Sequence, residues 1–186
     1  DFLLITGPNG GGKTSLLRTI LRLQSPTKGR ISFFRQGEPV SSLDMGYLPQ
    51  KNSIDSRFPI TVEEVVASGL MGNTQKGNTK FDSKKEIDEM LDLMGITALR
   101  NKPIGVLSGG QLQRSLFGRA LISKPEMLIL DEPASYIDRQ FGNRMFEILR
   151  DLSSNGTTIM MVSHEIEPFI TLSNRNLYIN HILGDR

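Results

Sequence analysis

The fold of this chain follows from one stretch, Gly7-Pro8-Asn9-Gly10-Gly11-Gly12-Lys13-Thr14. It satisfies the phosphate-loop pattern, in which a glycine-rich turn ends in Lys followed by Ser or Thr. The apolar run Phe2–Ile5 before it predicts a buried strand, and the residues after it predict a helix from Lys13 to about Leu23. The turn therefore lies between a strand and a helix, which is the context that the pattern requires.

The chemistry of such a loop comes from its backbone and from two side chains. Glycines let N–H groups turn inward around phosphates, and the helix N-terminus adds a partial positive charge. We expect Lys13 to reach the β and γ phosphates of a nucleotide and the Thr14 hydroxyl to bind Mg²⁺. The residues expected to line the phosphates are Gly7, Pro8, Asn9, Gly10, Gly11, Gly12, Lys13, Thr14 and Ser15.

Two adjacent acids, Asp131 and Glu132, follow the apolar run Met127–Leu130. The carboxyl ends of parallel strands meet at one edge of a sheet, so this pair should lie beside the phosphate loop. Successive side chains of a strand point in opposite directions, so the two acids should have separate roles. We expect Asp131 to hold the hydration shell of Mg²⁺ and Glu132 to polarise the attacking water.

The rest of the chain predicts an α/β fold with a largely parallel sheet. Further strand signals lie at Arg30–Phe34, Thr157–Val162 and Asn176–Ile179, with helical patterns between the later ones. Between the strand signals at Arg30–Phe34 and Met127–Leu130, residues 51–118 are predicted to form a helical insertion in the α/β fold.

Helix-start signals support that insertion. Thr61 with Glu64, and Ser83 with Glu86, match the capping-box spacing, and each pair predicts a helix N-terminus. The second helix would carry an apolar stripe and end at Gly95, and the polar residues 72–80 before it are expected to form a mobile loop. The stripe consists of Ile87, Met90, Leu91 and Met94.

Composition narrows the class of protein. The 186 residues are 38% hydrophobic and 23% charged, which is typical of one globular domain. A formal net charge of +2 gives no sign of a nucleic-acid-binding surface. No apolar run approaches the roughly 18 residues of a membrane span, and no basic head of a signal peptide is present. The absence of Cys suits a reducing compartment, so a cytoplasmic location is expected.

A glycine pair opens another predicted helix, in Leu107-Ser108-Gly109-Gly110-Gln111. A capping box explains Ser108 and Gln111. It leaves the two glycines unexplained, because each Gly weakens a helix by about 1 kcal/mol. A helix N-terminus without side chains lets a ligand approach the backbone N–H groups closely. Such a helix end is a typical anion-binding site.

Together these motifs resemble those of the ATP-binding-cassette (ABC) ATPases. Leu107–Gln111 is identical to the family's signature, and Tyr47-Leu48-Pro49-Gln50 is similar to its Q-loop. Ser135-Tyr136-Ile137-Asp138 resembles its D-loop, and Ser163-His164-Glu165 resembles its switch histidine. The motifs occur in the family's order and at similar spacing, so the resemblance covers almost the whole chain.

The resemblance implies a P-loop NTPase core that binds ATP and Mg²⁺ and hydrolyses ATP. Gln50 would contact Mg²⁺ or the attacking water, and His164 would contact the γ-phosphate. The signature residues Leu107, Ser108, Gly109, Gly110 and Gln111, together with Asp138, would bind the nucleotide held by a second copy. Two copies would thus sandwich two nucleotides head to tail, and a lone chain should be a poor ATPase.

The resemblance also implies a division of the chain, and the sequence departs from the family's pattern at two motifs. Residues 1–50 and 119–186 would form the nucleotide-binding core, and 51–118 the helical subdomain. The usual D-loop reads Ser-Ala-Leu-Asp, so Tyr136 and Ile137 depart from it. The phosphate-loop pattern starts close to Asp1, so we expect an N-terminal β segment to precede it, where the family places an aromatic residue against adenine.

Spacing and local similarity point to a class of cassette. Only 95 residues separate Lys13 from Ser108, without sustained heptads, which disfavours the coiled-coil chromosome ATPases. Asp55–Val66 and Leu177–His181 look like bacterial zinc and manganese uptake ATPases and, less closely, like iron-siderophore and cobalamin importers. The alternative is a non-transport cassette acting in translation or nucleic-acid transactions.

The importer interpretation implies a set of partners. They are a second copy of the domain, transmembrane permease subunits and, indirectly, an external substrate-binding protein, with no nucleic acid expected. The chain would lie in the cytoplasm against the inner face of the cell membrane.

Overall fold

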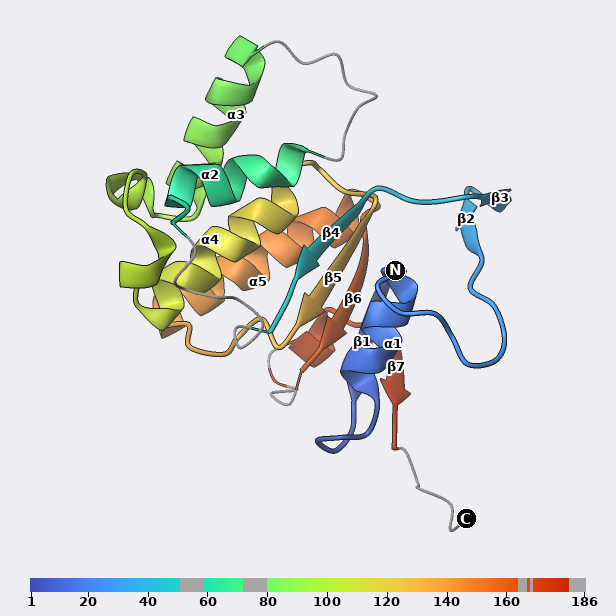
Figure 1. The fold of residues 1–186 in the computed structure, drawn as a ribbon. Helices are drawn as coiled ribbons and strands as arrows, with labels where there is room; N and C mark the ends of the chain where they lie inside the picture. Colours follow the sequence, from blue (N-terminus) through green and yellow to red (C-terminus); the bar gives the residue numbers. More distant parts are fainter. Residues whose placement is uncertain (51–58, 72–79, 164–166, 168, 181–186) are drawn as a thin grey trace.

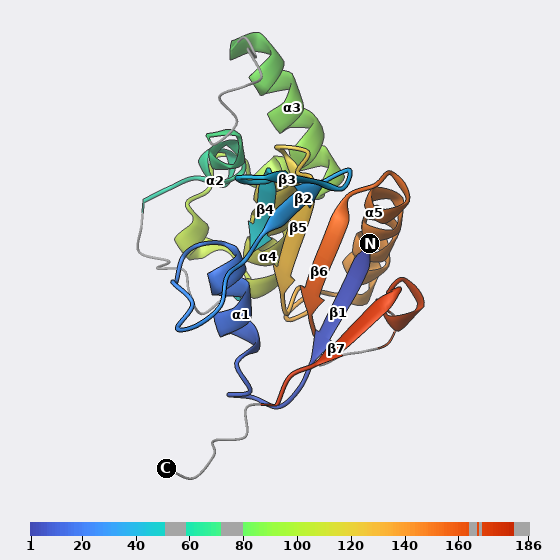
Figure 2. The same ribbon diagram turned by 90° about the vertical axis from the view of Figure 1, so that its right-hand side faces the viewer.

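The computed structural model describes residues 1–50, 59–71, 80–163, 167 and 169–180. At its centre is a parallel sheet of five strands in the order β4-β5-β6-β1-β7 (Figures 1 and 2). The strands are β1 (Phe2–Thr6), β4 (Met45–Leu48), β5 (Met127–Asp131), β6 (Thr158–Val162) and β7 (Arg175–Tyr178). The predicted α/β fold with a largely parallel sheet is therefore confirmed.

Helices cover both faces of this sheet. They are α1 (Lys13–Ile20), α2 (Val62–Ala67), α3 (Lys80–Leu93), α4 (Gly109–Leu121) and α5 (Arg139–Ser154), with short 3₁₀ turns at Ser68–Leu70, Thr97–Leu99, Ile104–Val106 and Phe169–Thr171. In Figure 1, α1 lies on one side of the strands, and α2, α4 and α5 lie on the other.

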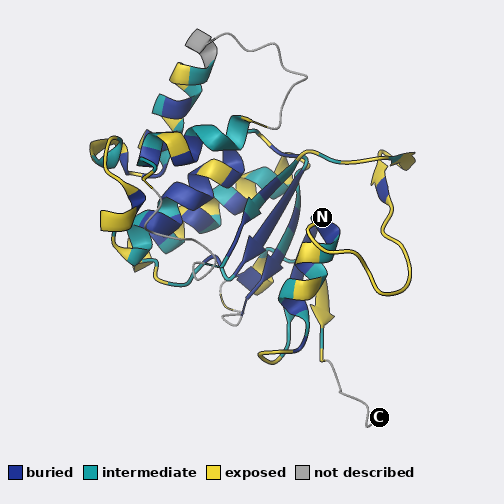
Figure 3. Ribbon diagram, viewed as in Figure 1, coloured by how far each residue is buried: buried dark blue, intermediate teal, exposed yellow. Residues whose placement is uncertain are grey.

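The alternation of side chains along the strands explains this two-sided covering. Leu128 and Leu130 of β5 join the large core formed with α2 to α5. Met127 and Ile129, on the opposite face of the same strand, pack with Leu17 of α1. Every residue of β5 is buried, as Figure 3 shows for the centre of the sheet. Such strands read as continuous apolar runs in the sequence because neither face meets water.

A small antiparallel sheet lies beside the main one. It pairs β2 (Phe33–Arg35) with β3 (Glu38–Val40) and is largely exposed (Figure 3). The buried ring of Phe33 and two hydrogen bonds from the Arg35 guanidinium to the Glu126 carboxylate, at 2.5 and 2.6 Å, attach it to the core. The strand predicted at Arg30–Phe34 is thus shorter and shifted, and β3 was not predicted because it contains Pro39, which is unusual in strands.

The sequence did not predict β4, since a Gly and a Pro interrupt its pattern. A Cβ at Gly46 would lie 2.0 Å from the carbonyl oxygen of Ala120. Only Gly fits there, because β4 passes directly against the backbone of α4. Tertiary packing, rather than strand propensity, places this strand.

Two predicted helix boundaries are wrong. The first helix ends at Ile20 rather than Leu23, because Arg22 adopts a left-handed φ of 58° and the Leu23 N–H bonds to the Arg18 carbonyl at 2.9 Å, closing a Schellman motif. The helix predicted to begin at Ser83 is α3, which begins at Lys80. Ser83 therefore lies inside α3 and is not its N-cap.

Other helix predictions are confirmed. Thr61 caps α2 with the expected capping box, and Gly95, at φ 66°, ends α3. The apolar stripe of α3 faces the core. The loop expected at residues 72–80 lies, up to residue 79, outside the described residues.

The division of the chain at residues 51–118 stays a prediction, and its later boundary falls inside α4, which continues to Leu121. Within the part of the chain that the structure describes, no helix has the length and apolar run required to cross a membrane.

Candidate nucleotide site

The phosphate loop follows β1 and leads directly into α1. Gly10 and Gly12 have φ values of 76° and 95°, which glycine adopts without strain. A Cβ at Gly7 would lie 1.9 Å from the carbonyl oxygen of Ile179, so this position admits no larger residue. The loop therefore folds as the sequence predicts because its glycines remove both conformational and steric obstacles.

Lys13 lies at the centre of this loop. Its side chain is 6% exposed, and its Nζ donates to the carbonyl oxygens of Gly7 and Pro8 at 2.8 and 2.9 Å. These two bonds hold the ammonium against the inside of the turn. A buried ammonium in a ring of backbone groups is suited to meet the negative charge of phosphates.

Asp131 ends β5 next to the first turn of α1. The Thr14 hydroxyl donates to Asp131 Oδ2 at 3.1 Å, although 117 residues separate the two in sequence. Asp131 is 1% exposed. Burial raises the pKa of this carboxyl, and the hydrogen bond from Thr14 opposes the rise only in part. The structure therefore brings together two of the three residues predicted to hold Mg²⁺, Thr14 and Asp131.

Glu132 lies in a different environment from its neighbour. It has a left-handed φ of 54°, which turns the chain sharply out of β5. A non-glycine residue in this region costs about 1–2 kcal/mol, and such strain is often found at functional sites. Its carboxylate accepts a hydrogen bond from Gln50 Nε2 at 3.1 Å. Gln50, which lies two residues after the end of β4, thus contacts Glu132. These are the two residues predicted to act on the attacking water.

These groups surround one cleft of about 420 Å³. Its lining consists of Asn9, Gly10, Gly11, Gly12, Lys13, Thr14, Ser15, Gln50 and Glu132. The phosphate loop, the catalytic candidate Glu132 and Gln50 thus share a single space. The remaining catalytic candidate, His164, lies outside the described residues.

The signature residues lie elsewhere, at the start of α4. Ser108 caps this helix by accepting from the Gln111 N–H at 3.3 Å, and Gln111 Oε1 accepts from the Ser108 N–H at 3.0 Å, so the predicted capping box forms. Ser108 to Gln111 line a second groove of about 570 Å³, together with Arg114, Tyr136 and Asp138. Leu107 directly precedes the cap.

The two hollows have no lining residue in common. Within one chain, the signature therefore does not join the phosphate loop.

Asp138 has structural partners that the sequence analysis missed. Its Oδ1 accepts from the Phe141 N–H at 3.0 Å and caps α5, and its Oδ2 forms an ion pair with Arg114. The Arg114 guanidinium also lies 4.5 Å from the ring centre of Phe141. A capping signal, Asp before an apolar helix face, was available in the sequence for Asp138, whereas nothing local marks Arg114.

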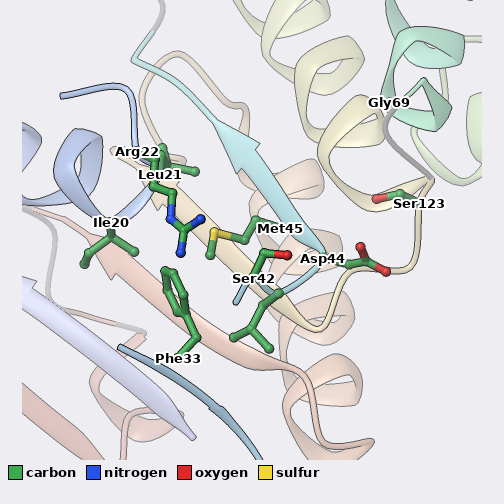
Figure 4. A pocket seen from close by; sticks show the side chains of 10 residues that line it. Ile20, Leu21, Arg22, Phe33, Ser42, Asp44, Met45, Gly69 and Ser123 are labelled. Atoms are coloured by element: carbon green, nitrogen blue, oxygen red, sulfur yellow. The ribbon is translucent and has the colours of Figure 1, made fainter. Parts of the chain in front are cut away.

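A third groove, of about 440 Å³, lies at the other end of α1 (Figure 4). Ile20, Arg22, Phe33 and Met45 point toward it, and the Arg22 guanidinium lies 5.3 Å from the ring centre of Phe33. None of the predicted site residues lines this groove, so it is separate from the nucleotide cleft.

Comparison with known proteins agrees with this geometry. The family described as ABC transporter matches residues 1–135. Over 187 residues the chain is 40% identical to a probable metal transport system ATP-binding protein of Chlamydia pneumoniae, covering 98% of this chain and 76% of the relative. Over 191 residues it is 38% identical to the zinc uptake system ATP-binding protein ZurA of Listeria monocytogenes, covering 99% and 71%.

A solved structure supports the same assignment. A dimeric ATP-binding cassette in a post-hydrolysis state, bound to ADP and phosphate, matches with a TM-score of 0.81 at 25% identity, over 97% of this chain and 81% of that one. The family match covers most of the chain, and the relatives align along nearly all of it. This chain belongs to the ABC transporter family.

Proposed function

We propose that this chain is the ATP-binding and ATP-hydrolysing subunit of an importer for a metal ion of the zinc or manganese type. The observation that carries the ATPase assignment is the pair of hydrogen bonds beside the phosphate loop. Thr14 meets Asp131, and Gln50 meets Glu132. Asp131 is thus next to a hydroxyl that can bind a metal, and Glu132 is exposed to the cleft.

The oxygen groups at Thr14 and Asp131 fit Mg²⁺, which prefers hydroxyl, carboxylate and water ligands. A buried carboxyl with a raised pKa gains from a nearby cation, because the cation favours its ionised form. Thr14 and Asp131 would hold the ion, and its positive charge would offset the negative charge of the phosphates. Gln50 is the third candidate for contact with this ion.

The remaining chemistry belongs to side chains of the cleft. The Lys13 ammonium would stabilise charge on the phosphates. The Glu132 carboxylate would orient and deprotonate the attacking water, and Gln50 would hold that carboxylate in place through its amide. We propose that His164, which lies outside the described residues, contacts the γ-phosphate.

The proposed cargo rests on the relatives. Two proteins that align along nearly the whole chain are described as a metal transport and a zinc uptake ATP-binding protein. We infer that permease subunits and an external binding protein select the ion, and that this chain works at the inner face of the membrane. We also infer that two copies bind two nucleotides head to tail, since the signature groove and the phosphate cleft are separate in one chain.

Glu132→Gln tests the ATPase assignment. The change keeps the size of the side chain and an oxygen acceptor but removes the base, so hydrolysis by the assembled full-length protein should slow by roughly 10²–10⁴-fold. Mg-ATP should still bind, because Lys13, Thr14 and Asp131 are intact. We expect the variant to accumulate as an ATP-bound dimer, measured by light scattering during size-exclusion chromatography.

Glu86→Gln is a matched control, because it makes the same chemical change on α3, far from the cleft in sequence and outside its lining. It should hydrolyse ATP at the wild-type rate. Hydrolysis by Glu132→Gln at that same rate would contradict the role of Glu132.

Uptake of radioactive zinc tests the cargo. Cells that lack this protein should lose zinc or manganese uptake and recover it with the wild-type gene but not with Glu132→Gln. Loss of iron-chelate uptake instead, with zinc and manganese uptake unchanged, would overturn the proposed cargo while leaving the ATPase assignment intact.

A further inference from the structure

Gln113 is a polar residue buried inside the molecule. It belongs to α4, and its side chain is 1% exposed. Its Nε2 donates to the carbonyl oxygen of Pro133 at 3.2 Å, and its Oε1 has no hydrogen-bond partner within the part of the chain that the structure describes. A buried amide oxygen without a partner is unfavourable, and leucine or methionine would suit a buried helix position without that cost. The stability of α4 therefore does not explain this residue.

The hydrogen bond of Gln113 reaches the turn at Glu132. Pro133 directly follows Glu132 and is buried. The Ser135 N–H donates to the Glu132 carbonyl at 3.3 Å, which closes a turn with proline as its second residue, the position that proline prefers. This hydrogen bond leaves the carbonyl of Pro133 free to accept another donor, and the Gln113 amide supplies one from α4.

The backbone of Glu132 adopts a conformation that needs support. A residue before a proline prefers extended backbone with a negative φ, yet Glu132 has a φ of 54°. Such a conformation persists where surrounding contacts impose it. On one side, the Glu132 N–H donates to the Val162 carbonyl of β6 at 2.9 Å. On the other side, Gln113 holds the carbonyl of the next residue.

The face of α4 that includes Gln113 lies against the segment after Glu132. A Cβ at Gly110 would lie 2.8 Å from the carbonyl oxygen of Tyr136, so the two backbones are in close contact. Residues three positions apart lie on the same face of a helix, as Gly110 and Gln113 do. Of these two contacts, the one made by Gln113 is nearer to Glu132 in sequence.

We propose that Gln113 is a positioning residue for ATP hydrolysis, whose hydrogen bond to Pro133 holds the Glu132 carboxylate toward the cleft. A general base must lie within hydrogen-bond reach of the water that it deprotonates, so a shift of the turn would slow the reaction. Nucleotide binding does not depend on Gln113, because Lys13 and Thr14 are held by other contacts. The proposal rests on the role of Glu132 in the proposed function.

Gln113→Met tests the hydrogen bond in the assembled full-length protein. Methionine has a similar length and suits a helix, but it cannot donate to Pro133. We expect kcat for ATP hydrolysis to fall by about tenfold or more, while KM for ATP and the number of ATP molecules bound per chain stay at their wild-type values. Gln113→Asn keeps the amide but shortens its reach, so it should give the same result without the volume of methionine.

A double-mutant cycle shows whether Gln113 acts through Glu132. Glu132→Gln removes the base, so adding Gln113→Met should slow the residual hydrolysis by less than about twofold. Ser115→Ala is the matched control, because Ser115 is another buried polar residue of α4, 0% exposed, whose hydroxyl bonds within the helix to the Gln111 carbonyl at 2.9 Å. It should leave kcat unchanged.

The outcomes distinguish failure of this proposal from failure of the proposed function. Wild-type hydrolysis by Gln113→Met and Gln113→Asn, with Glu132→Gln slow, would overturn the role of Gln113 and leave that of Glu132 intact. Wild-type hydrolysis by Glu132→Gln would overturn both roles. An equal fall of kcat with and without the Glu132 carboxylate, or an equal fall in Ser115→Ala, would show a general effect on α4 and overturn positioning.

Discussion

At the level of single residues, a sharp turn of the backbone at Glu132 places two adjacent acids, Asp131 and Glu132, in different environments. Asp131 is the last residue of a fully buried strand, and burial raises the pKa of its carboxyl. Glu132 leaves the strand through a left-handed turn and meets Gln50 in the cleft. Asp131 is thereby kept next to the Thr14 hydroxyl, which we propose as a ligand of Mg²⁺, and Glu132 is turned toward the cleft, where the proposed attacking water would lie.

Asp131→Asn should make the nucleotide-free protein more stable and the nucleotide complex weaker. The folded-state pKa of Asp131 lies above its unfolded value, so the ionised carboxyl lowers folding stability as the pH rises through that raised pKa. Asn keeps an oxygen acceptor for Thr14 and carries no charge to bury. At pH 7 we expect a higher melting temperature than wild type without nucleotide, and a smaller increase on adding Mg-ATP.

Scanning calorimetry of both proteins, with and without Mg-ATP, checks this, and repetition at acid pH is the control. Once wild-type Asp131 is protonated in both states, the advantage of Asn should shrink. A lower melting temperature for nucleotide-free Asp131→Asn at pH 7 would show that the carboxylate stabilises the fold, contrary to the expectation.

At the scale of elements, side-chain caps fix where three functional helices begin. The caps are Thr61 for α2, Ser108 for α4 and Asp138 for α5. Each accepts the N–H of a residue three positions later, which satisfies a donor that the helix itself cannot. The caps of α4 and α5 both line the signature groove, and Arg114 of α4 forms an ion pair with the α5 cap Asp138, so the same residues shape both the helices and the groove.

Asp138→Asn should reduce stability in a pH-dependent way. The Phe141 N–H, and then Arg114, hold the pKa of the Asp138 carboxyl below its ordinary value. A lowered pKa contributes stability that is present above the unfolded pKa and is lost as the pH falls through the folded one. Asn still caps the helix but removes the charge that pairs with Arg114 and favours the N-terminus of α5.

The measurement is urea denaturation of both proteins from pH 7 down to acid pH. Wild type should be the more stable at pH 7, and the difference should fade as the pH drops below about 5. Addition of salt at pH 7 should also reduce the difference, since the ion pair is exposed. A difference that is constant across the pH range would contradict the ionic role of Asp138.

Across the whole molecule, the phosphate cleft and the signature groove of one chain are two separate hollows. The phosphate cleft is lined by the loop, Gln50 and Glu132, and the signature groove opens at the start of α4, with no lining residue in common. If two copies pair head to tail, each nucleotide meets the cleft of one copy and the signature of the other. Function would then depend on the assembly rather than on the folded chain.

A mixed dimer tests this arrangement. Ser108→Arg in one copy combined with Lys13→Ala in the other places both lesions in one composite site and leaves the second site intact, so ATP hydrolysis should persist. Both changes in a single copy damage each site once, so hydrolysis should fall by more than tenfold if Lys13 stabilises the transferred phosphoryl group as proposed. Tandem-linked copies keep the two arrangements apart, and equal hydrolysis rates would argue against head-to-tail pairing.

Features that depend on neighbouring residues could be predicted from the amino-acid sequence. The glycine-rich turn, the apolar strand before Asp131, the capping boxes at Thr61 and Ser108, and the glycine at the end of α3 all appear as predicted. Each depends on backbone freedom, on alternation along a strand, or on a hydrogen bond that spans three residues. Such interactions are local, so a pattern in the sequence can predict them, although the capping-box pattern at Ser83 and Glu86 lies inside α3.

Contacts between distant segments follow from the packing of the whole chain. Thr14 meets Asp131 across 117 residues, and Gln50 meets Glu132 across 82. The strand β4, which delivers Gln50, exists because Gly46 lets it pass against α4, and the ion pair of Arg114 with Asp138 joins two helices that no local signal relates. These contacts follow from how elements pack and which strands pair, and packing depends on the shape of the whole core rather than on any one stretch of sequence.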